Sequence, residues 1–255
     1  MKLNLGDVIS TSTLDWPGKV VLVVFMRGCP LRCPYCSNAR FIGVPEDCEG
    51  TDVESVNARV LDAADFVDGV VFSGGEPFMQ PASLKEMASY VRGLGLLVGI
   101  HTNGAYPDRI RDMANEGLLD AVFLDVKAPL EPGAYVAASG DVAKGAVESI
   151  KRSLALCCDL RKMNKLQFLE VRTTVFRGIS DKPEDIVKIA SAIDCADAYV
   201  IQQGRPEVAE DEGLKATEAV PRKALLELAR AARESTAKVK AIKVRTHMFG
   251  DEAVN

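Results

Sequence analysis

Apolar runs and stretches of helical period alternate along most of the chain. Segments in which apolar side chains recur every three to four residues lie at 52–65, 82–94, 107–117, 142–157, 183–192 and 221–235. Short apolar runs typical of buried strands lie at Val20–Met26, Gly69–Ser73, Leu97–Ile100, Ala121–Leu124, Leu169–Val175 and Ala198–Ile201, with a further candidate at Ala241–Thr246. This alternation predicts an α/β fold in which parallel strands are joined by right-handed crossovers.

The number of strand and helix units favours a partial barrel. Six units fit a (β/α)6 TIM-type barrel, because a closed barrel of eight units typically needs about 250 residues without the long segment that follows the first strand here. A short run at Val8–Ser10 precedes that strand, and Pro17 followed by Gly18 suits the middle of a type II turn between the two. We therefore expect an N-terminal hairpin within a single domain over residues 1–255, with a core at 18–203 and a C-terminal helix and strand at 221–247.

The composition is that of an ordinary globular chain. Of its 255 residues, 47% are apolar and 26% are charged, and the net charge is -5. The acidic balance argues against a nucleic-acid partner, since no run of basic and aromatic residues offsets it. No apolar stretch approaches the ~20 residues that span a bilayer, and the first residues lack a signal-peptide core. We expect a cytoplasmic protein without a membrane partner, whose 7 cysteines serve as ligands and free thiols rather than disulfides.

The most distinctive stretch is Cys29-Pro-Leu-Arg-Cys33-Pro-Tyr-Cys36, directly after the first predicted strand. Three thiolates this close on one loop can converge on a metal centre. A four-iron cluster held by three cysteines leaves one iron free for a substrate or cofactor. Structural zinc is the alternative, but it usually takes four ligands from two separated pairs, and the chain has no second such pair. The remaining cysteines are Cys48, Cys157, Cys158 and Cys195, of which the adjacent pair lies in an apolar helical pattern typical of packing residues.

Glycines and polar residues follow the second and third predicted strands at their C-terminal ends, where barrel enzymes build their active sites. Gly74, Gly75 and Glu76 follow the second strand, and His101-Thr102-Asn103-Gly104 follows the third. The glycines expose backbone and the carboxylate can accept from an ammonium group, although such a tripeptide can also be a plain tight turn. We expect His101 to line or pack the site rather than bind a metal, because no partner histidine lies nearby in the sequence.

The later strands add charged and amide side chains. Asp125 and Lys127 follow the fourth strand two residues apart, so they lie on one side of an extended segment, either as a solvated ion pair or as part of a site. Arg172 alternates with apolar residues in the fifth strand and would face the barrel interior. There it needs an anion, which can be a cofactor carboxylate or an internal acidic side chain. Gln202 lies at the end of the sixth strand.

Together these features resemble the radical S-adenosylmethionine (radical SAM) enzymes. The C-x3-C-x2-C spacing, with Tyr35 before the last cysteine, is similar to the signature of that family. The resemblance implies a [4Fe-4S] cluster on Cys29, Cys33 and Cys36, and a bound S-adenosylmethionine that is cleaved reductively to a 5'-deoxyadenosyl radical. It further implies that S-adenosylmethionine is held by the Tyr35 backbone, Gly74, Gly75, Glu76, Asn103, Asp125, Lys127, Arg172 and Gln202. Because the radical abstracts the hydrogen atom, no side chain is needed as a catalytic acid or base.

A narrower resemblance is to the enzymes that activate glycyl radical enzymes. Residues 12–19 and 202–206 are similar to segments of the longer anaerobic ribonucleotide reductase activating proteins, the second with Gly204 in place of an aromatic residue. The resemblance implies abstraction of a hydrogen atom from a glycine of a partner, with anaerobic ribonucleotide reductase favoured, and an electron from a flavodoxin or ferredoxin. His101 stands where some activases carry an aspartate that helps to bind a monovalent cation, and Ser37 stands where relatives often carry a histidine.

Two alternatives stay open from the sequence. One is a radical SAM enzyme that acts on a small molecule or a peptide and turns over without a glycyl radical partner. The other is a non-catalytic iron–sulfur or metal-binding protein, whose cluster spectrum would not respond to S-adenosylmethionine. The sequence has no further cysteine motif for a second cluster, and a barrel with little to cover its open side leaves room for a macromolecular partner.

Overall fold

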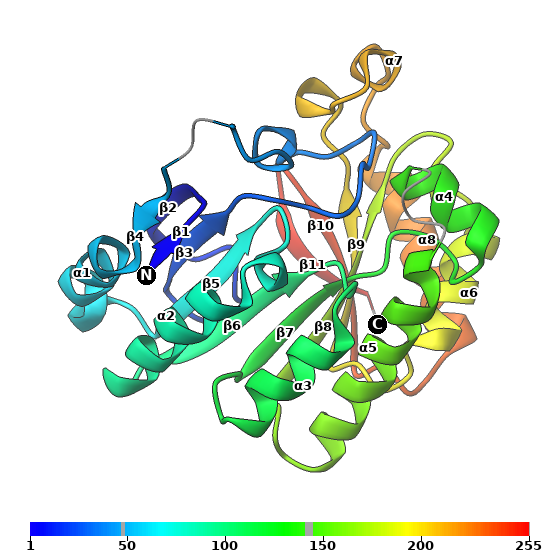
Figure 1. Cartoon of the computed structure of the whole chain (residues 1–255). Coiled ribbons are helices and arrows are strands. Elements are labelled where there is room, and N and C mark those ends of the chain that lie inside the picture. The colour runs from blue at the N-terminus through cyan, green and yellow to red at the C-terminus, as the bar shows by residue number, and fades with distance from the viewer. Residues whose placement is uncertain (47–48, 141–144, 255) are drawn as a thin grey trace.

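A curved sheet of nine strands organises the molecule (Figure 1). The computed structural model describes residues 1–46, 49–140 and 145–254. The strand order is β11-β10-β9-β8-β7-β6-β5-β3-β2, with parallel pairing from β3 to β10 and antiparallel edges at β2 and β11. The strands are β2 Leu5–Ser12, β3 Val21–Met26, β5 Gly69–Gly74, β6 Leu97–Thr102, β7 Ala121–Asp125, β8 Phe168–Val175, β9 Ala198–Gln203, β10 Ala241–Thr246 and β11 Gly250–Val254.

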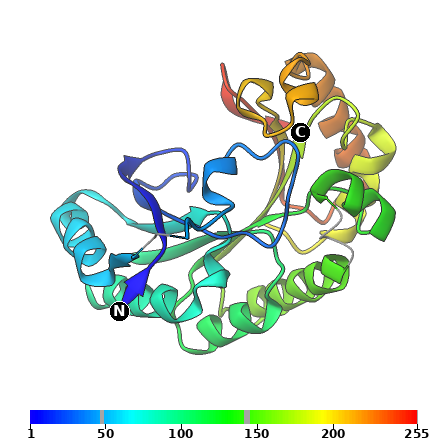
Figure 2. The same cartoon turned by 45° about the horizontal axis from the view of Figure 1, so that its top comes forward.

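Helices cover the outer face of the sheet, and Figure 2 shows them as an arc around it. They are α1 Val53–Ala63, α2 Pro81–Gly93, α3 Pro107–Asn115, α4 Pro132–Ser139, α5 Ala146–Lys162, α6 Pro183–Ala192 and α8 Arg222–Ser235, with the short α7 Glu212–Lys215 near the open end. Helix α8 buries Leu225 and Leu228 on its apolar face. Prolines 81, 107 and 183 stand in the first turn of α2, α3 and α6, where a backbone N–H is not needed. No helix in the described part of the chain combines the length and apolar character that crossing a membrane requires.

The predicted α/β fold and partial barrel are confirmed. The six predicted strands and the further candidate, β10, form one open and mostly parallel sheet. The helix predicted at 183–192 is α6, and the helix predicted at 142–157 is α5, which runs from Ala146 to Lys162. Residues 142–144 of that prediction lie outside the described residues. The sequence did not indicate α4, α7, β11, or the small sheet formed by β1 Lys2–Leu3 and β4 Thr51–Asp52.

The N-terminal hairpin is also confirmed. Strands β2 and β3 pair in antiparallel fashion. The Lys19 N–H donates to the Trp16 carbonyl at 3.0 Å, and Gly18 has a φ of +75°, as a type II turn requires. Trp16 itself is 5% exposed and packs edge-on against Phe123, with ring centroids 5.7 Å apart. The segment between β2 and β3 therefore inserts its aromatic side chain into the barrel interior.

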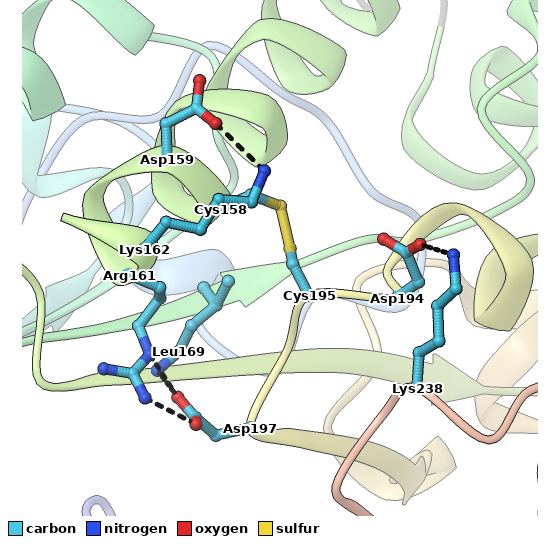
Figure 3. Close-up of a disulfide and its surroundings, with 9 residues drawn as sticks. All are labelled: Cys158, Asp159, Arg161, Lys162, Leu169, Asp194, Cys195, Asp197 and Lys238. Carbon is cyan, nitrogen blue, oxygen red and sulfur yellow. Dashed lines mark hydrogen bonds and ion pairs between the residues drawn. A yellow bond between two sulfur atoms is a disulfide. The ribbon is translucent and has the colours of Figure 1, made fainter. Parts of the chain in front are cut away.

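A disulfide corrects one expectation. Cys158 on α5 is bonded to Cys195 in the segment before β9, with Cα atoms 5.4 Å apart (Figure 3). The expectation of free thiols is wrong for this pair, because helical periodicity carries no information on which loop packs against the helix. Cys157 is a buried free thiol, as expected. Cys48 lies outside the described residues.

Candidate active site

A cavity of about 850 Å³ lies at the C-terminal ends of the barrel strands. Its lining includes every residue predicted from the sequence to hold the cluster or S-adenosylmethionine, except Glu76. These lining residues are Cys29, Cys33, Tyr35, Cys36, Gly74, Gly75, Asn103, Asp125, Lys127, Arg172 and Gln202. The parallel sheet thus brings together residues from five strand ends and the cysteine loop, although their individual roles stay predictions.

Backbone hydrogen bonds anchor the cysteine loop to the end of β5. The Gly75 N–H donates to the Met26 carbonyl at 2.8 Å, and the Glu76 N–H donates to the Gly28 carbonyl at 2.7 Å. A Cβ atom at Gly75 would lie 2.2 Å from the Gly28 carbonyl oxygen. Gly75 therefore serves the close approach of two backbone segments, which no other residue type would allow.

The three cysteines of the loop line the cavity as free thiols. Burial raises the pKa of Cys29 to about 12 and also raises the pKa of Cys36, so ligation must displace protons from these thiols. Among the residues that the structure describes, no three His, Cys, Asp or Glu side chains are placed to hold a single metal ion. A multi-iron cluster is compatible, because each thiolate binds a different iron.

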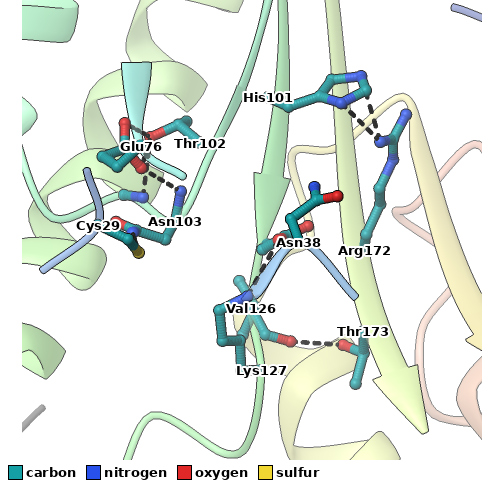
Figure 4. Close-up of polar contacts among 12 residues, drawn as sticks. Cys29, Asn38, Glu76, His101, Thr102, Asn103, Val126, Lys127, Arg172 and Thr173 are labelled. Carbon is teal, nitrogen blue, oxygen red and sulfur yellow. Dashed lines mark hydrogen bonds and ion pairs between the residues drawn. The ribbon is translucent and has the colours of Figure 1, made fainter. Parts of the chain in front are cut away.

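Glu76 links the ends of β5 and β6 (Figure 4). Its buried carboxylate accepts from the Thr102 hydroxyl at 3.0 Å and from the backbone N–H groups of Asn103 at 2.8 Å and Phe78 at 3.2 Å. Burial raises the pKa of Glu76 to about 7, although these donors favour the charged form. The same contacts place the Asn103 amide nitrogen 3.7 Å from the Cys29 sulfur. Glu76 thus shapes the cavity wall, and its contact with the amino group of S-adenosylmethionine stays a prediction.

Asp125 and Lys127 form an ion pair at the end of β7. The Lys127 ammonium lies 3.0 Å from Asp125 Oδ2, and the lysine side chain is only 14% exposed, unlike that of an ordinary solvated pair. Burial disfavours the charge on Lys127, but Asp125 and Cys33 outweigh it and raise the pKa of the lysine well above its usual value. The Lys127 backbone N–H also donates to the Tyr135 hydroxyl at 3.2 Å. The pair therefore presents a firmly charged ammonium group to the cavity.

Arg172 is held by an internal carboxylate and by His101. Its Nε donates to Glu170 at 2.5 Å. Its Nη1 lies 3.3 Å from His101 Nε2 (Figure 4). His101 Nε2 also lies 3.0 Å from the Asp15 carbonyl, and Nδ1 lies 3.2 Å from the Ser73 hydroxyl. Burial, followed by the neighbouring Arg172 charge, lowers the pKa of His101 well below its usual value, so the ring is neutral. Glu170 supplies one of the two anions considered for Arg172, and a bond to the carboxylate of S-adenosylmethionine stays a prediction.

The aromatic residue of the cysteine motif is fixed by stacking. Tyr35 is buried, and its ring stacks on Phe176 with centroids 5.2 Å apart. This contact sets the path of the backbone between Cys33 and Cys36, which the sequence predicts to contact S-adenosylmethionine. Asn38, just after the loop, donates from its amide to the Gly74 carbonyl at 3.3 Å, so it ties the loop back to β5.

Comparison with known proteins assigns the family. A model of the radical SAM superfamily matches residues 23–191. The chain belongs to this superfamily. A protein of Methanocaldococcus jannaschii, provisionally named a glycyl-radical enzyme activating enzyme, is 36% identical over 218 residues, which cover 84% of this chain and 85% of that protein. The pyruvate formate-lyase-activating enzyme of Staphylococcus epidermidis is 25% identical over 209 residues, which cover 77% of this chain and 78% of the relative.

Two solved structures share the radical SAM fold of the chain. The structure of TYW1 with a lysine-pyruvate adduct aligns with a TM-score of 0.61 and 18% identity, over 90% of this chain and 77% of that one. Streptococcus suis SuiB bound to S-adenosylmethionine aligns with a TM-score of 0.63 and 15% identity, over 87% of this chain and 49% of that one. At these identities the likeness establishes the fold alone.

Radical SAM enzymes use a [4Fe-4S] cluster and S-adenosylmethionine, and the residues of this cavity fit both. Among the described residues, three thiols line the cavity without a fourth, so one iron of a cluster would lack a protein ligand. The nearby Lys127 ammonium is buried and suits the carboxylate of an amino acid. Backbone groups of Gly74 and Gly75 are open to the cavity, as a cofactor amino group would need.

Several cavity residues were missed from the sequence. Lys243 and Arg245 line the cavity from β10, and Asp251 lines it from β11. The alternation of these two cations with Ile242 and Val244 could have indicated a polar interior face on β10. No signal of this kind exists for Asp251, because the edge strand that carries it was not expected.

Proposed function

We propose that this radical SAM enzyme activates a glycyl radical enzyme by abstracting a hydrogen atom from a glycine of that partner. The observation that carries the proposal is the extent of the cavity. Its lining begins at the cysteine loop and continues past Gln202 to β10 and β11, beyond every residue predicted to hold a cofactor. This leaves room for a polypeptide segment beside the cofactors. The names of the two relatives described above support the same reaction.

The residues of the chain divide into those for the cluster and those for S-adenosylmethionine. We assign Cys29, Cys33 and Cys36 to the cluster. We assign the ammonium of Lys127 and the guanidinium of Arg172 to the carboxylate of S-adenosylmethionine. The backbone of Tyr35, together with Gly74, Gly75, Glu76, Asn103, Asp125 and Gln202, completes this second set. When bound, the two cofactors together supply the radical that abstracts hydrogen, so the side chains bind and orient rather than transfer protons.

The favoured partner is anaerobic ribonucleotide reductase. The support is the similarity of residues 12–19 and 202–206 to the longer activating proteins of that reductase, and both segments contribute to the cavity lining. Within the first of them, Asp15 offers its carbonyl to His101. We place the reaction in the cytoplasm, with a flavodoxin or a ferredoxin as the source of the electron.

Electron paramagnetic resonance of the anaerobically reconstituted, dithionite-reduced protein tests this function. S-adenosylmethionine should shift the cluster signal, and the anaerobic ribonucleotide reductase should then acquire a glycyl doublet. Pyruvate formate-lyase is tested in parallel as the alternative partner. A doublet on the lyase alone would correct the choice of partner. Formation of 5'-deoxyadenosine without a glycyl signal on either protein would overturn the activating function and favour a small-molecule or peptide substrate.

A pair of cysteine variants tests the cluster assignment separately. Cys33→Ala removes one of three thiolates, so we expect it to lose the four-iron cluster and all cleavage of S-adenosylmethionine. Cys157→Ala removes a buried thiol of α5 that does not line the cavity, so it should keep full iron content. Iron and sulfide analysis with the visible absorption spectrum measures both. A normal cluster in Cys33→Ala would contradict the assignment.

A further inference from the structure

The cavity ends in a polar wall formed by β8, β9 and β10. Thr174, Gln202 and Arg245 are neighbours in register across these strands, and all three line the cavity. Lys243 precedes Arg245 by two residues on β10 and lines the cavity as well, because residues two apart in a strand share a face. This wall lies outside the set of residues assigned to the cofactors, apart from Gln202.

The cations of the wall are not equally paired. Arg245 is bonded through two nitrogens to Asp251 at 2.6 and 3.0 Å. The ammonium of Lys243 has only a distant contact, 3.9 Å to Asp251 Oδ2, and makes no hydrogen bond with any residue that the structure describes. The lysine side chain is only 25% exposed. A partly buried lysine that lines the cavity and leaves its ammonium donors free of close acceptors in the described part of the chain suits an anionic ligand at this position.

The surroundings of Lys243 favour a carboxylate over a phosphate. Arg245 is the guanidinium group of the wall, and its paired donors, which would bind a phosphate best, are already engaged by Asp251. Asp251 and Asp15 line the same cavity, and their negative charges would repel a dianion. A single ammonium next to such acidic groups suits a single negative charge.

The rim of the cavity indicates that this carboxylate belongs to a protein. Residues 13–18 form one side of the rim, and the turn between β10 and β11 forms the other. Figure 2 shows the blue N-terminal strands and the red C-terminal strands at the two ends of the arc. Leu14 on the first side is 77% exposed, and Met248 and Phe249 on the second are 86% and 61% exposed. Large apolar side chains around a charged subsite are typical of a surface that contacts another protein.

We propose that Lys243 binds a carboxylate carried by the glycine-bearing segment of the partner protein, which enters between residues 13–18 and the β10–β11 turn. The proposal rests on the activating function and adds a determinant of specificity to it. An acidic residue at a fixed distance from the target glycine would set the register in which that glycine reaches the cofactors.

Peptide binding to the cluster-free chain tests the proposal without relying on activity. The probes are fluorescein-labelled, blocked heptapeptides with a central glycine, in which glutamate or isosteric glutamine occupies each other position in turn. Fluorescence anisotropy at low salt should show one position at which the glutamate peptide binds about tenfold more tightly than its glutamine counterpart, as expected for one charge-assisted hydrogen bond. In Lys243→Gln this ratio should fall to within about twofold.

Two further variants make the test specific. Lys240→Gln removes a neighbouring lysine that is 69% exposed and bonded to Asp197, so it should keep the preference for glutamate. Lys243→Glu should reverse the preference toward a peptide with lysine at the same position. Lack of any glutamate preference in the unmodified chain, or its persistence in Lys243→Gln, would overturn the subsite. A Lys243-dependent preference without a glycyl radical on any partner would instead count against the activating function.

Discussion

At the scale of single residues, Glu76 makes the stability of the chain depend on pH. Its pKa is raised from 4.5 to about 7 in the folded protein, chiefly by burial. The folded chain therefore binds this proton more tightly than the unfolded chain. The contribution of Glu76 to the free energy of unfolding is largest below pH 4.5, and we expect it to fall by about 3 kcal/mol as the pH rises through 7.

The difference in free energy of unfolding between the unmodified chain and Glu76→Gln isolates this contribution. Glutamine does not titrate, and the other titratable groups contribute equally to both proteins. Denaturant unfolding of the two cluster-free proteins between pH 4.5 and 8 gives the measurement. The unmodified chain should lose stability relative to the variant as the pH rises. A difference that stays constant over this range would mean that the carboxylate does not titrate there.

The chemical types of the site residues could be predicted from the sequence, but the directions of their side chains could not. Eleven of the twelve residues that were predicted from cysteine spacing, strand-end position and the family resemblance line one cavity. Glu76 turns away because donors of Thr102 and Asn103 on the neighbouring strand reach its carboxylate. Arg172 meets Glu170, which also faces the interior from β8. Such pairings depend on register and packing, which a single sequence does not specify.

At the scale of elements, the disulfide ties α5 to the start of β9 and should stabilise the fold without touching the site. Cys158 and Cys195 are separated by 37 residues in sequence. A cross-link that closes a loop of this length restricts the unfolded chain by roughly 3–4 kcal/mol. The bond precedes the N-terminal end of β9, whereas the cavity lies at the C-terminal ends of the strands. Reduction should therefore lower stability and leave cofactor binding unchanged.

Unfolding in urea with and without a thiol reductant measures this effect on the cluster-free chain. The variant Cys158→Ala with Cys195→Ala should unfold like the reduced protein and should not respond to the reductant. Cys157→Ala, which lacks only the neighbouring free thiol, should still respond. Equal stability of the oxidised and reduced chains would show that the bond does not constrain the unfolded state.

The elements that could be predicted from the sequence are those with a clear hydrophobic pattern of their own. Helix α6 has apolar residues at helical spacing, and strand β3 is an unbroken apolar run. The structure also contains β11, whose Gly250-Asp-Glu-Ala-Val sequence has no such run, and which forms by pairing with β10. The disulfide belongs to the same class, because the contact between α5 and the loop after α6 arises only from tertiary packing.

At the scale of the whole molecule, the barrel is open because its two edge strands, β2 and β11, do not pair with each other in the described part of the chain. The side chain of Trp16 fills part of its interior. Trp16 lies against β6, where a Cβ atom at Gly99 would come within 2.8 Å of its ring. Around it pack Val23, Val71 and Phe123. Residues 13–18 therefore both line the rim of the cavity and place Trp16 in the interior of the barrel.

Because the Trp16 ring is seated on Gly99 of β6, we expect substitutions at these two positions to be energetically coupled. Trp16→Ala should destabilise the fold by about 3–5 kcal/mol, because it leaves a large cavity in the barrel interior. Gly99→Ala should be costly in the unmodified chain, since the new methyl group meets the indole ring, but it should cost much less once Trp16 is alanine. Urea unfolding of the four proteins in this double-mutant cycle measures the coupling. Additive effects would mean that the indole is not seated on β6, and that the rim segment is held in place by the Asp15–His101 contact and the turn alone.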